Sequence, residues 1–363
     1  MTTGIEGERC RRYLEVSEEE TPASGWLKNC ASPFDLIVAE GFEERSIGFL
    51  ECAATVGAAV GGIVIGRYTS NARANAKYHS RFIGAARALT GKSVHETAID
   101  YDGKWFNAAL DGLSQAELVV DITGLSTRSL FGVLDAAGRS RRRVTIAYTE
   151  AREYWPKRSR WVQLDRQLSK AATIADIIDK QPWLFGYQHH VELIPGHEGY
   201  DSVGSGRALV GFLPFKSARL AAVLGEEDYE HVVFVAGCPR LVRNRWRLEA
   251  LKTINRDISK RWATKEMPTF GYRKALGQLV DLLYSGDGVM ERYDVHVALL
   301  GSKLQDVACW IASCLIPSIT IVTSVPVRYY PSAFSEGIGR RWVFRLTSPD
   351  SEMVDCSAKL VVA

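Results

Sequence analysis

The sequence lacks the patterns that mark several large classes of protein. Its seven cysteines, spread over 363 residues, include no Cys-x-x-Cys pair, and an odd, unpatterned set favours reduced thiols over a disulfide framework. The longest apolar run, 52–66, is rich in alanine and glycine and is too short to cross a bilayer. The glutamate-rich first twenty residues do not suit a signal peptide. These absences predict a cytoplasmic protein without a membrane segment.

Sequence motifs for common cofactors and catalytic centres are also missing. There is no G-x-G-x-x-G, no G-x-x-x-x-G-K-[ST], no H-E-x-x-H and no G-x-S-x-G. His189, His190 and His197 lie close together, but their spacing is not that of a zinc site, so surface histidines in a turn are the favoured interpretation. We therefore predict no cofactor, no metal and no catalytic residue.

Composition describes an ordinary globular protein of moderate size. Hydrophobic residues make up 46% of the chain and charged residues 24%, and the length allows two domains with separate cores. The formal net charge of +3 is close to neutral, so bulk charge does not favour a duplex nucleic-acid binder. The oligomeric state stays open.

One segment of the chain occurs twice. An apolar strand at 119–121 runs into Ile-Thr-Gly-Leu-Ser-Thr-Arg, and an apolar strand at 297–300 runs into Gly-Ser-Lys. A helix-like stretch and a second apolar strand follow each turn, and an arginine follows the second strand. Arg128 and Arg152 are 24 residues apart, and Lys303 and Arg328 are 25 apart. The near-repeat predicts an internal duplication.

Strands alternate with helices through both copies, which predicts βαβ units and mostly parallel sheets. The expected fold is α/β, with two Rossmann-like halves. We expect an N-terminal extension over 1–33, a first half over 34–155, a helical linker or insertion over 156–205, and a second half with C-terminal strands over 206–363.

Small, hydroxyl-bearing and cationic residues at the ends of the strands are the candidate ligand contacts. Ligands of parallel α/β sheets collect where strands hand over to helices, because helix N-termini present free N–H groups and a partial positive charge. The candidates are Gly41, Arg45, Thr69, Thr123, Gly124, Ser126, Thr127, Arg128, Arg152, Lys216, Gly301, Ser302, Lys303 and Arg328. For one copy taken alone, a helix cap or a turn is the favoured interpretation of Gly124, Ser126 and Thr127. The second copy shifts the balance towards a phosphate-bearing ligand.

Two other segments leave alternatives open. Arginine and tyrosine side by side at 152–154 and 328–330 either stack on a base or pack an interface between the halves. The basic and aromatic stretch 155–166 either contacts single-stranded nucleic acid or an acidic partner, or forms a solvated helix. The solvated helix is the favoured interpretation.

Residues 119–149 form a pattern of a strand, Asp-Ile-Thr-Gly, a hydroxyl residue, a cation and a helix. This pattern resembles the CRISPR-associated Rossmann-fold (CARF) sensors and the related SAVED sensors, in which two CARF-like units share one chain. The resemblance implies a cyclic oligonucleotide signal bound over the strand ends between the two halves, and an effector protein in trans in antiviral defence. Leu125 and Arg128 stand where these families often have a second glycine and a lysine. A metal-independent nuclease that opens such a ring, with Lys216, Arg128 and Lys303 stabilising charge, and a non-catalytic subunit of a defence complex remain alternatives.

Overall fold

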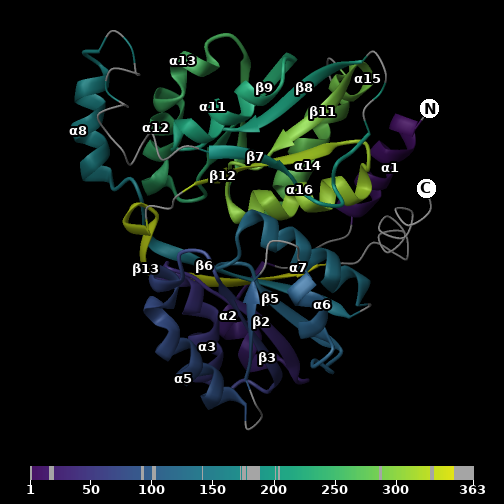
Figure 1. Ribbon diagram of the computed structural model, residues 1–363, viewed down its shortest axis with the longest axis vertical. Coiled ribbons are helices and arrows are strands. Elements are labelled where there is room, and N and C mark those ends of the chain that lie inside the picture. Colours follow the sequence, from purple (N-terminus) through teal and green to yellow (C-terminus); the bar gives the residue numbers. More distant parts are fainter. Residues whose placement is uncertain are drawn as a thin grey trace. The chain divides into compact units, whose positions relative to one another are not determined.

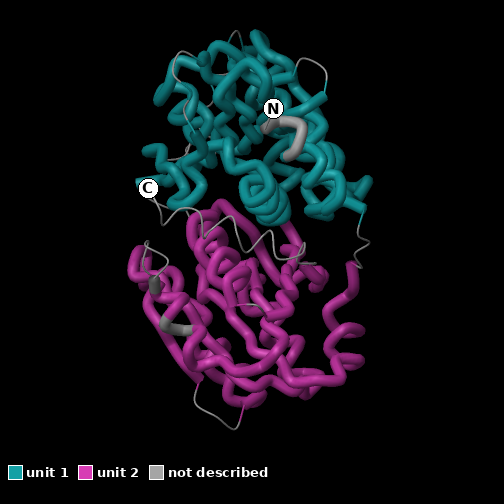
Figure 2. Tube along the Cα trace, turned by 90° about the vertical axis from the view of Figure 1, so that its right-hand side faces the viewer, with its two compact units in different colours: residues 1–16, 156–330, 356–363 teal, residues 17–155, 331–355 magenta. Residues whose placement is uncertain are grey.

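The protein forms two compact units, seen in the computed structural model (Figures 1 and 2). Unit 1 comprises Met1–Val16, Pro156–Tyr330 and Cys356–Ala363, and unit 2 comprises Ser17–Trp155 and Pro331–Asp355. The structure describes residues 2–346 except for 16–19, 91–93, 100–103, 141, 172, 174–176, 178–188, 201, 203–204, 286–287 and 328–330. No helix in this described part is long and apolar enough to cross a membrane.

Unit 2 is built on a seven-stranded sheet with the order β1-β13-β6-β5-β2-β3-β4. Its strands are β1 (Glu20–Pro22), β2 (Phe34–Glu40), β3 (Val60–Tyr68), β4 (His95–Ile99), β5 (Glu117–Asp121), β6 (Arg143–Tyr154) and β13 (Ser335–Leu346). Its helices are α2 (Ala23–Asn29), α3 (Gly48–Val56), α4 (Ala72–Asn75), α5 (His79–Leu89), α6 (Lys104–Leu110) and α7 (Thr127–Arg139), with short 3-10 turns η1 (Glu44–Ile47), η2 (Ala76–Tyr78) and η4 (Pro331–Ala333). The five strands β2 to β6 are mutually parallel.

Unit 1 is built on a six-stranded sheet with the order β10-β9-β8-β11-β12-β7. Its strands are β7 (His189–Leu193), β8 (Gly206–Phe212), β9 (Tyr229–Cys238), β10 (Ala263–Pro268), β11 (Tyr293–Ala298) and β12 (Thr320–Pro326). Its helices are α1 (Thr2–Glu15), α8 (Arg158–Leu168), α11 (Ser217–Glu226), α12 (Trp246–Ile254), α13 (Arg256–Ser259), α14 (Tyr272–Tyr284), α15 (Val289–Arg292) and α16 (Lys303–Leu315), with the 3-10 turn η3 (Val242–Asn244). The strands β8 to β12 are mutually parallel.

The two sheets share one strand order. Numbered along the chain, the five parallel strands of each unit lie in the order 3-2-1-4-5, which is the first part of the doubly wound Rossmann order. In both units an antiparallel strand lies beside the fifth parallel strand. The prediction of an α/β fold with two Rossmann-like halves and mostly parallel sheets is confirmed, and the common order supports the internal duplication.

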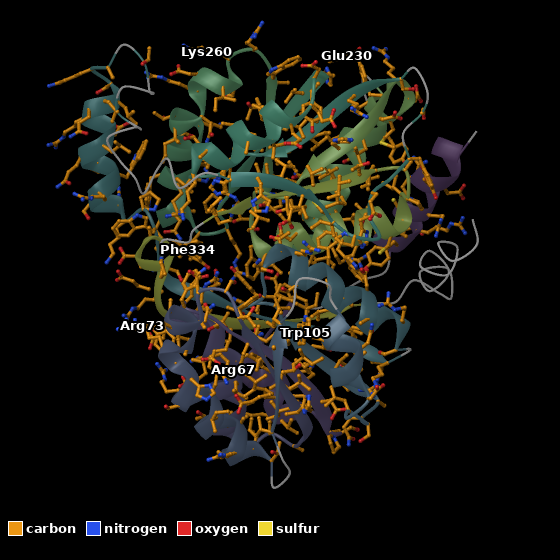
Figure 3. The ribbon with its side chains drawn as sticks, in the orientation of Figure 1. Arg67, Arg73, Trp105, Glu230, Lys260 and Phe334 are labelled. Carbon is orange, nitrogen blue, oxygen red and sulfur yellow. The ribbon has the colours of Figure 1, made fainter. Side chains whose placement is uncertain are left out.

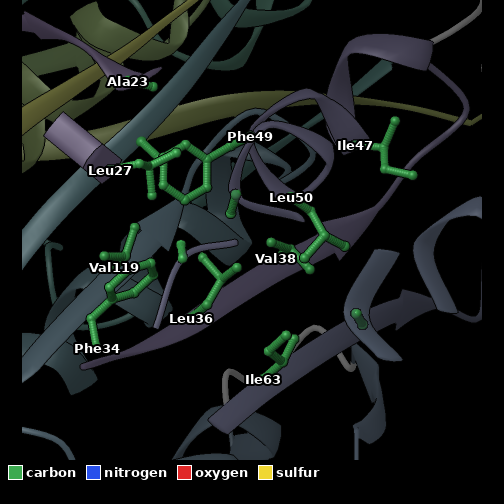
Figure 4. Packing of buried hydrophobic residues seen from close by; sticks show 14 of the residues in the cluster. Ala23, Leu27, Phe34, Leu36, Val38, Ile47, Phe49, Leu50, Ile63 and Val119 are labelled. Carbon is green, nitrogen blue, oxygen red and sulfur yellow. The ribbon is translucent and has the colours of Figure 1, made fainter. Parts of the chain in front are cut away.

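The apolar strand residues that predicted buried strands form the core of unit 2. Every residue of β2 and of β5 is buried, which is typical of central parallel strands covered on both faces. The helices α2 and α3 pack against this sheet through Leu27, Phe49 and Leu50, which meet Phe34 and Leu36 of β2 (Figure 4).

Each unit takes its antiparallel strand from the part of the chain that follows the other half. The strand β7 comes after the five parallel strands of unit 2, yet it pairs with β12 in unit 1. The strand β13 comes after the five parallel strands of unit 1, yet it pairs with β6 in unit 2 over its whole length. The two halves therefore exchange their last strands.

The position of β13 differs from the expectation that the C-terminal strands complete the second half. Trp342, Val343 and Phe344 are each less than a tenth exposed and cover the edge of unit 2 that β6 would otherwise present to solvent. The strand is also held by the guanidinium of Arg341, which donates to the carbonyl of Gly48 over 2.7 Å. Local sequence describes a strand but does not specify which of two similar edges it joins. The residues after 346, which the expected second half also included, lie outside the described residues.

This exchange predicts that unit 2 depends on a segment nearly 200 residues away from its parallel strands in sequence. A chain that ends after residue 331 should lose hydrogen-exchange protection in β6 and bind a hydrophobic dye, because the edge of the sheet and its apolar side chains become exposed. A chain that ends after residue 347, which keeps β13, is the matched control. Equal protection of β6 in the two truncated chains would contradict the prediction.

Candidate functional site

The candidate residues after β2 and β5, and after β8 and β11, lie at equivalent places in the two units. In a 3-2-1-4-5 sheet the chain winds in opposite directions from strands 1 and 4, and ligands bind outside the carboxyl ends of that strand pair. In unit 2 the pair is β2 and β5, followed by Gly41 and by 122–128. In unit 1 the pair is β8 and β11, followed by Lys216 and by 301–303. The structure therefore assigns most predicted residues to the two switch points.

The turn after β5 is held together by its own residues. Thr123 donates its backbone N–H and its hydroxyl to Oδ1 of Asp121, over 3.0 and 2.5 Å, and its hydroxyl accepts from the N–H of Thr149 over 2.9 Å. A Cβ on Gly124 would lie 2.1 Å from the carbonyl oxygen of Ala39, so this glycine is required for the approach of two backbones. Thr123 and Gly124 thus have structural roles whether or not a ligand binds.

Ser126 begins the helix α7. Its hydroxyl accepts from the N–H of Ser129 over 3.1 Å, as an N-cap does. Its own N–H donates to the hydroxyl of Tyr68, which in turn donates to the carbonyl of Gly124. Tyr68, at the end of β3, was not a predicted site residue, and no local pattern distinguishes it from a core tyrosine. It occupies one backbone donor that an anion would otherwise use.

The turn after β11 repeats this arrangement with different residues. Ser302 caps α16 in a capping box with Gln305, and its hydroxyl also donates to the carbonyl of Thr269 over 2.8 Å. A Cβ on Gly301 would come within 3.0 Å of the Phe212 ring at the end of β8. Lys303 is 18% exposed, and its Nζ lies 3.7 Å from Oδ2 of Asp306. Both units therefore place a capped helix N-terminus and a cation at the switch point.

Arg45 lies inside unit 2. Its side chain is 9% exposed, its Nε donates to Glu43 over 3.0 Å and its Nη1 donates to the carbonyl of Thr149 over 3.2 Å. The guanidinium also lies over the rings of Tyr148 and Tyr154, 5.8 and 5.6 Å from their centres. These contacts join the turn after β2 to the end of β6, and they describe a structural arginine.

The other predicted residues are more scattered. Thr69 is exposed directly after β3, Arg152 is exposed on β6 beside Gly337 of β13, and Lys216 occupies the N-cap position of α11. Thr127 and Arg128 form the first turn of α7 and are partly exposed. Arg328 lies outside the described residues.

A charged cluster beside the first switch point was missed. Glu40, at the end of β2, is 2% exposed and contacts Nε of Arg67 over 3.2 Å and Nδ1 of His79 over 3.1 Å. Arg67 also reaches Glu96 over 3.2 Å. Arg67 is labelled in Figure 3. The described residues contain no group of three or more histidine, cysteine or carboxylate side chains placed to hold a metal ion.

A cavity of about 410 Å³ lies elsewhere, at the amino ends of β8, β9 and β11. It is lined by Ser202, Ser205, Gly206, Arg207, Glu227, Asp228, Glu230 and Asp294. Four carboxylates against one arginine make it a poor place for a phosphate. It does not coincide with the predicted site.

Comparison with known proteins gives little sequence similarity. The chain matches no family model, and no curated protein matches it. Among solved structures it is similar to a Type III CRISPR defence DNA nuclease activated by cyclic oligoadenylate, with 10% identity and a TM-score of 0.47. The similarity covers 77% of this chain and 64% of that one, so the chain spans less than two thirds of that protein.

Asp121 generates a prediction about pH. Burial raises the pKa of Asp121 from 3.8 to about 7, although its hydrogen bonds from Thr123 act in the opposite direction. Between these two pKa values the folded protein holds a proton that the unfolded chain has lost, so stability falls as pH rises, by about 1.4 kcal/mol per unit. Asp121→Asn should remove this pH dependence, so the free energy of unfolding of the variant should rise relative to that of the wild type between pH 5 and pH 7. Urea unfolding of both proteins across that range measures it, and parallel pH profiles would contradict it.

Arg45 generates a prediction that separates structure from binding. Arg45→Ala leaves Glu43 and the carbonyl of Thr149 without their buried donor, and the free energy of unfolding should fall by about 3 kcal/mol. Arg87→Ala, at an exposed position on α5, is the control and should change it by less than about 0.5 kcal/mol. Unchanged stability together with weaker ligand binding would make Arg45 a ligand contact instead.

Proposed function

We propose that the protein senses a nucleotide-derived signal, bound through its phosphates at the carboxyl ends of the parallel strands. One observation carries the proposal: both units place a capped helix N-terminus and a cation of that helix's first turn at the switch point of the same strand order. Helix N-termini attract anions through their N–H groups and their partial positive charge, and a first-turn cation adds to this.

The chemistry of the turns favours a phosphate over a carboxylate or a neutral ligand. In each unit the cation follows a serine N-cap, and the first-turn residues Thr127, Arg128 and Lys303 are partly exposed at the strand ends. Arginine can place two parallel N–H groups on one phosphate, and lysine adds a point charge. The resemblance of the sequence to CARF and SAVED sensors favours a cyclic oligonucleotide, which carries several phosphates.

The proposal includes a partner protein that receives the signal. The motifs that carry the resemblance belong to sensors that relay ligand binding to an effector. Affinity purification with and without the ligand tests this part separately. A partner whose association changes with the ligand supports a relay, whereas an association that ignores both the ligand and mutation at the strand ends supports a structural subunit.

A thermal-shift screen against cyclic di-, tri- and larger oligonucleotides is the first test. A ligand that binds only the folded state stabilises it by mass action and so raises the midpoint temperature of unfolding. At a ligand concentration of a hundred times the dissociation constant, the free energy of unfolding increases by about 2.7 kcal/mol. No shift with any member of the panel would overturn the proposal. Linear products after incubation would indicate that the protein also opens the ring.

Two single variants then locate the site. Arg128→Ala and Lys303→Ala should each weaken binding about tenfold or more, because each removes a charged hydrogen bond to phosphate worth about 1–3 kcal/mol. Arg139→Ala, in the last turn of α7, and Lys274→Ala, on α14, are exposed controls that remove the same charges elsewhere. Titration calorimetry measures all four. Equal affinities for the two test variants and wild type would rule out the strand-end site.

A further inference from the structure

The positive charge of the protein is concentrated in two segments of unit 1. Residues 157–170 contain five lysine and arginine residues and one carboxylate, and residues 240–261 contain eight and two. Together they carry a net charge of +10, whereas the whole chain carries +3, so the remainder carries −7. The chain is close to neutral as a whole, but its positive and negative charges are strongly separated along the sequence.

The two segments are neighbours in the fold. Trp161, Leu164 and Leu168 of α8 share one apolar cluster with Ala250 and Ile254 of α12. The guanidinium of Arg247, at the start of α12, donates to the carbonyl of Pro156 just before α8, over 3.1 Å. The two helices lie side by side in Figure 1, and this contact brings their N-termini together. Their partial positive charges add to those of the side chains there.

Some of these cations maintain the structure and others face solvent. Arg247 lies over the rings of Phe215 and Trp246, Arg240 lies over Phe270 and Lys260, labelled in Figure 3, pairs with Asp257. On α8 and in the turn before α12 the solvent-facing cations are Arg158, Arg160, Arg166, Arg243 and Arg245, whereas the exposed Lys170 and Arg261 lie outside these two elements. Among the described residues no carboxylate forms an ion pair with this set.

The surface offers charge without platforms for stacking. In the two segments Trp161 is buried, Trp246 is only partly exposed, and the exposed apolar side chains are Val162 and Val242. Trp262, directly after the second segment, is also only partly exposed. Proteins that bind single strands combine a basic surface with aromatic side chains on which bases stack. A duplex presents phosphates while its own bases are already stacked, and arginine is suited to phosphate oxygens.

We propose that α8 and the start of α12 form a binding surface for the phosphate backbone of duplex nucleic acid, independent of base sequence and separate from the strand-end site. The five solvent-facing arginines neutralise phosphates. Arg240 and Arg247 hold the surface in shape through their aromatic contacts.

The test measures binding of the full chain to a labelled duplex by fluorescence polarisation at several salt concentrations. If five arginines each neutralise one phosphate, the logarithm of the association constant should fall with the logarithm of salt with a slope near −4.5, at about 0.9 per contact. Arg158→Ala/Arg160→Ala/Arg166→Ala should reduce the magnitude of this negative slope by about 3 and weaken binding at least about tenfold at low salt. Arg243→Ala/Arg245→Ala should reduce the magnitude of the slope by about 2.

The control removes three exposed helical arginines elsewhere, in Arg87→Ala/Arg139→Ala/Arg292→Ala, and changes the net charge equally. It should leave duplex binding almost unchanged. An equal loss in this control would overturn the proposal, because binding would then follow total charge. Tighter binding of the single strand than of the duplex, or binding of polyglutamate but of neither nucleic acid, would overturn it in favour of a single-strand or an acidic protein surface.

Discussion

The exchange of the strands β7 and β13 between the two halves of the chain is the constraint on which both units depend. A parallel sheet that ends at β6 or at β12 leaves a row of backbone N–H and C=O groups without partners, and such edges must be paired or covered. Here nine of the twelve residues of β13 pair with β6, and all five residues of β7 pair with β12. Neither sheet is complete without a strand that follows the other half of the chain. The chain therefore passes from one unit to the other more than once.

A buried polar network organises the end of unit 2 at which ligands of this fold class bind. It runs from Asp121 through Thr123 to Thr149, and from there through Arg45 to Glu43. Such networks rigidify a structure when most of their groups are satisfied, and they are costly where one is not. Oδ2 of Asp121 lacks a hydrogen-bond partner among the described residues, in keeping with the raised pKa of this carboxyl group. The residues that look most like ligand contacts in the sequence are here partly the supports of the turn.

The distribution of charge assigns different roles to similar residues. Arg45 is enclosed by a carboxylate and two tyrosines, Arg247 is held by aromatic rings, and Arg243 faces solvent. A buried arginine is retained because its removal leaves partners unsatisfied, whereas an exposed one contributes little to stability. Exposed arginines without ion pairs are therefore better explained by an external binding partner than by a contribution to stability. The eight residues 240–247 contain four arginines, but carboxylates elsewhere in the chain offset their charge, so the total of +3 does not reveal them.

The sequence by itself determined the α/β class, the two halves and the turns after β5 and β11. These features follow from local patterns, since an apolar run between glycine and serine turns predicts a buried strand wherever it stands. The strand order that makes these turns switch points did not follow from the sequence, because local patterns do not specify which strands pair.

Only the tertiary structure decided which sheet β13 joins and that Arg45 lies inside unit 2. It also decided that Gly124 allows a close backbone contact with Ala39, and that the hydroxyl of Tyr68 accepts from a backbone N–H at the start of α7. Each depends on a partner distant in sequence: β6 for β13, Thr149 for Arg45. Local propensity contains no information about such partners, because pairing and burial are properties of the assembled sheet.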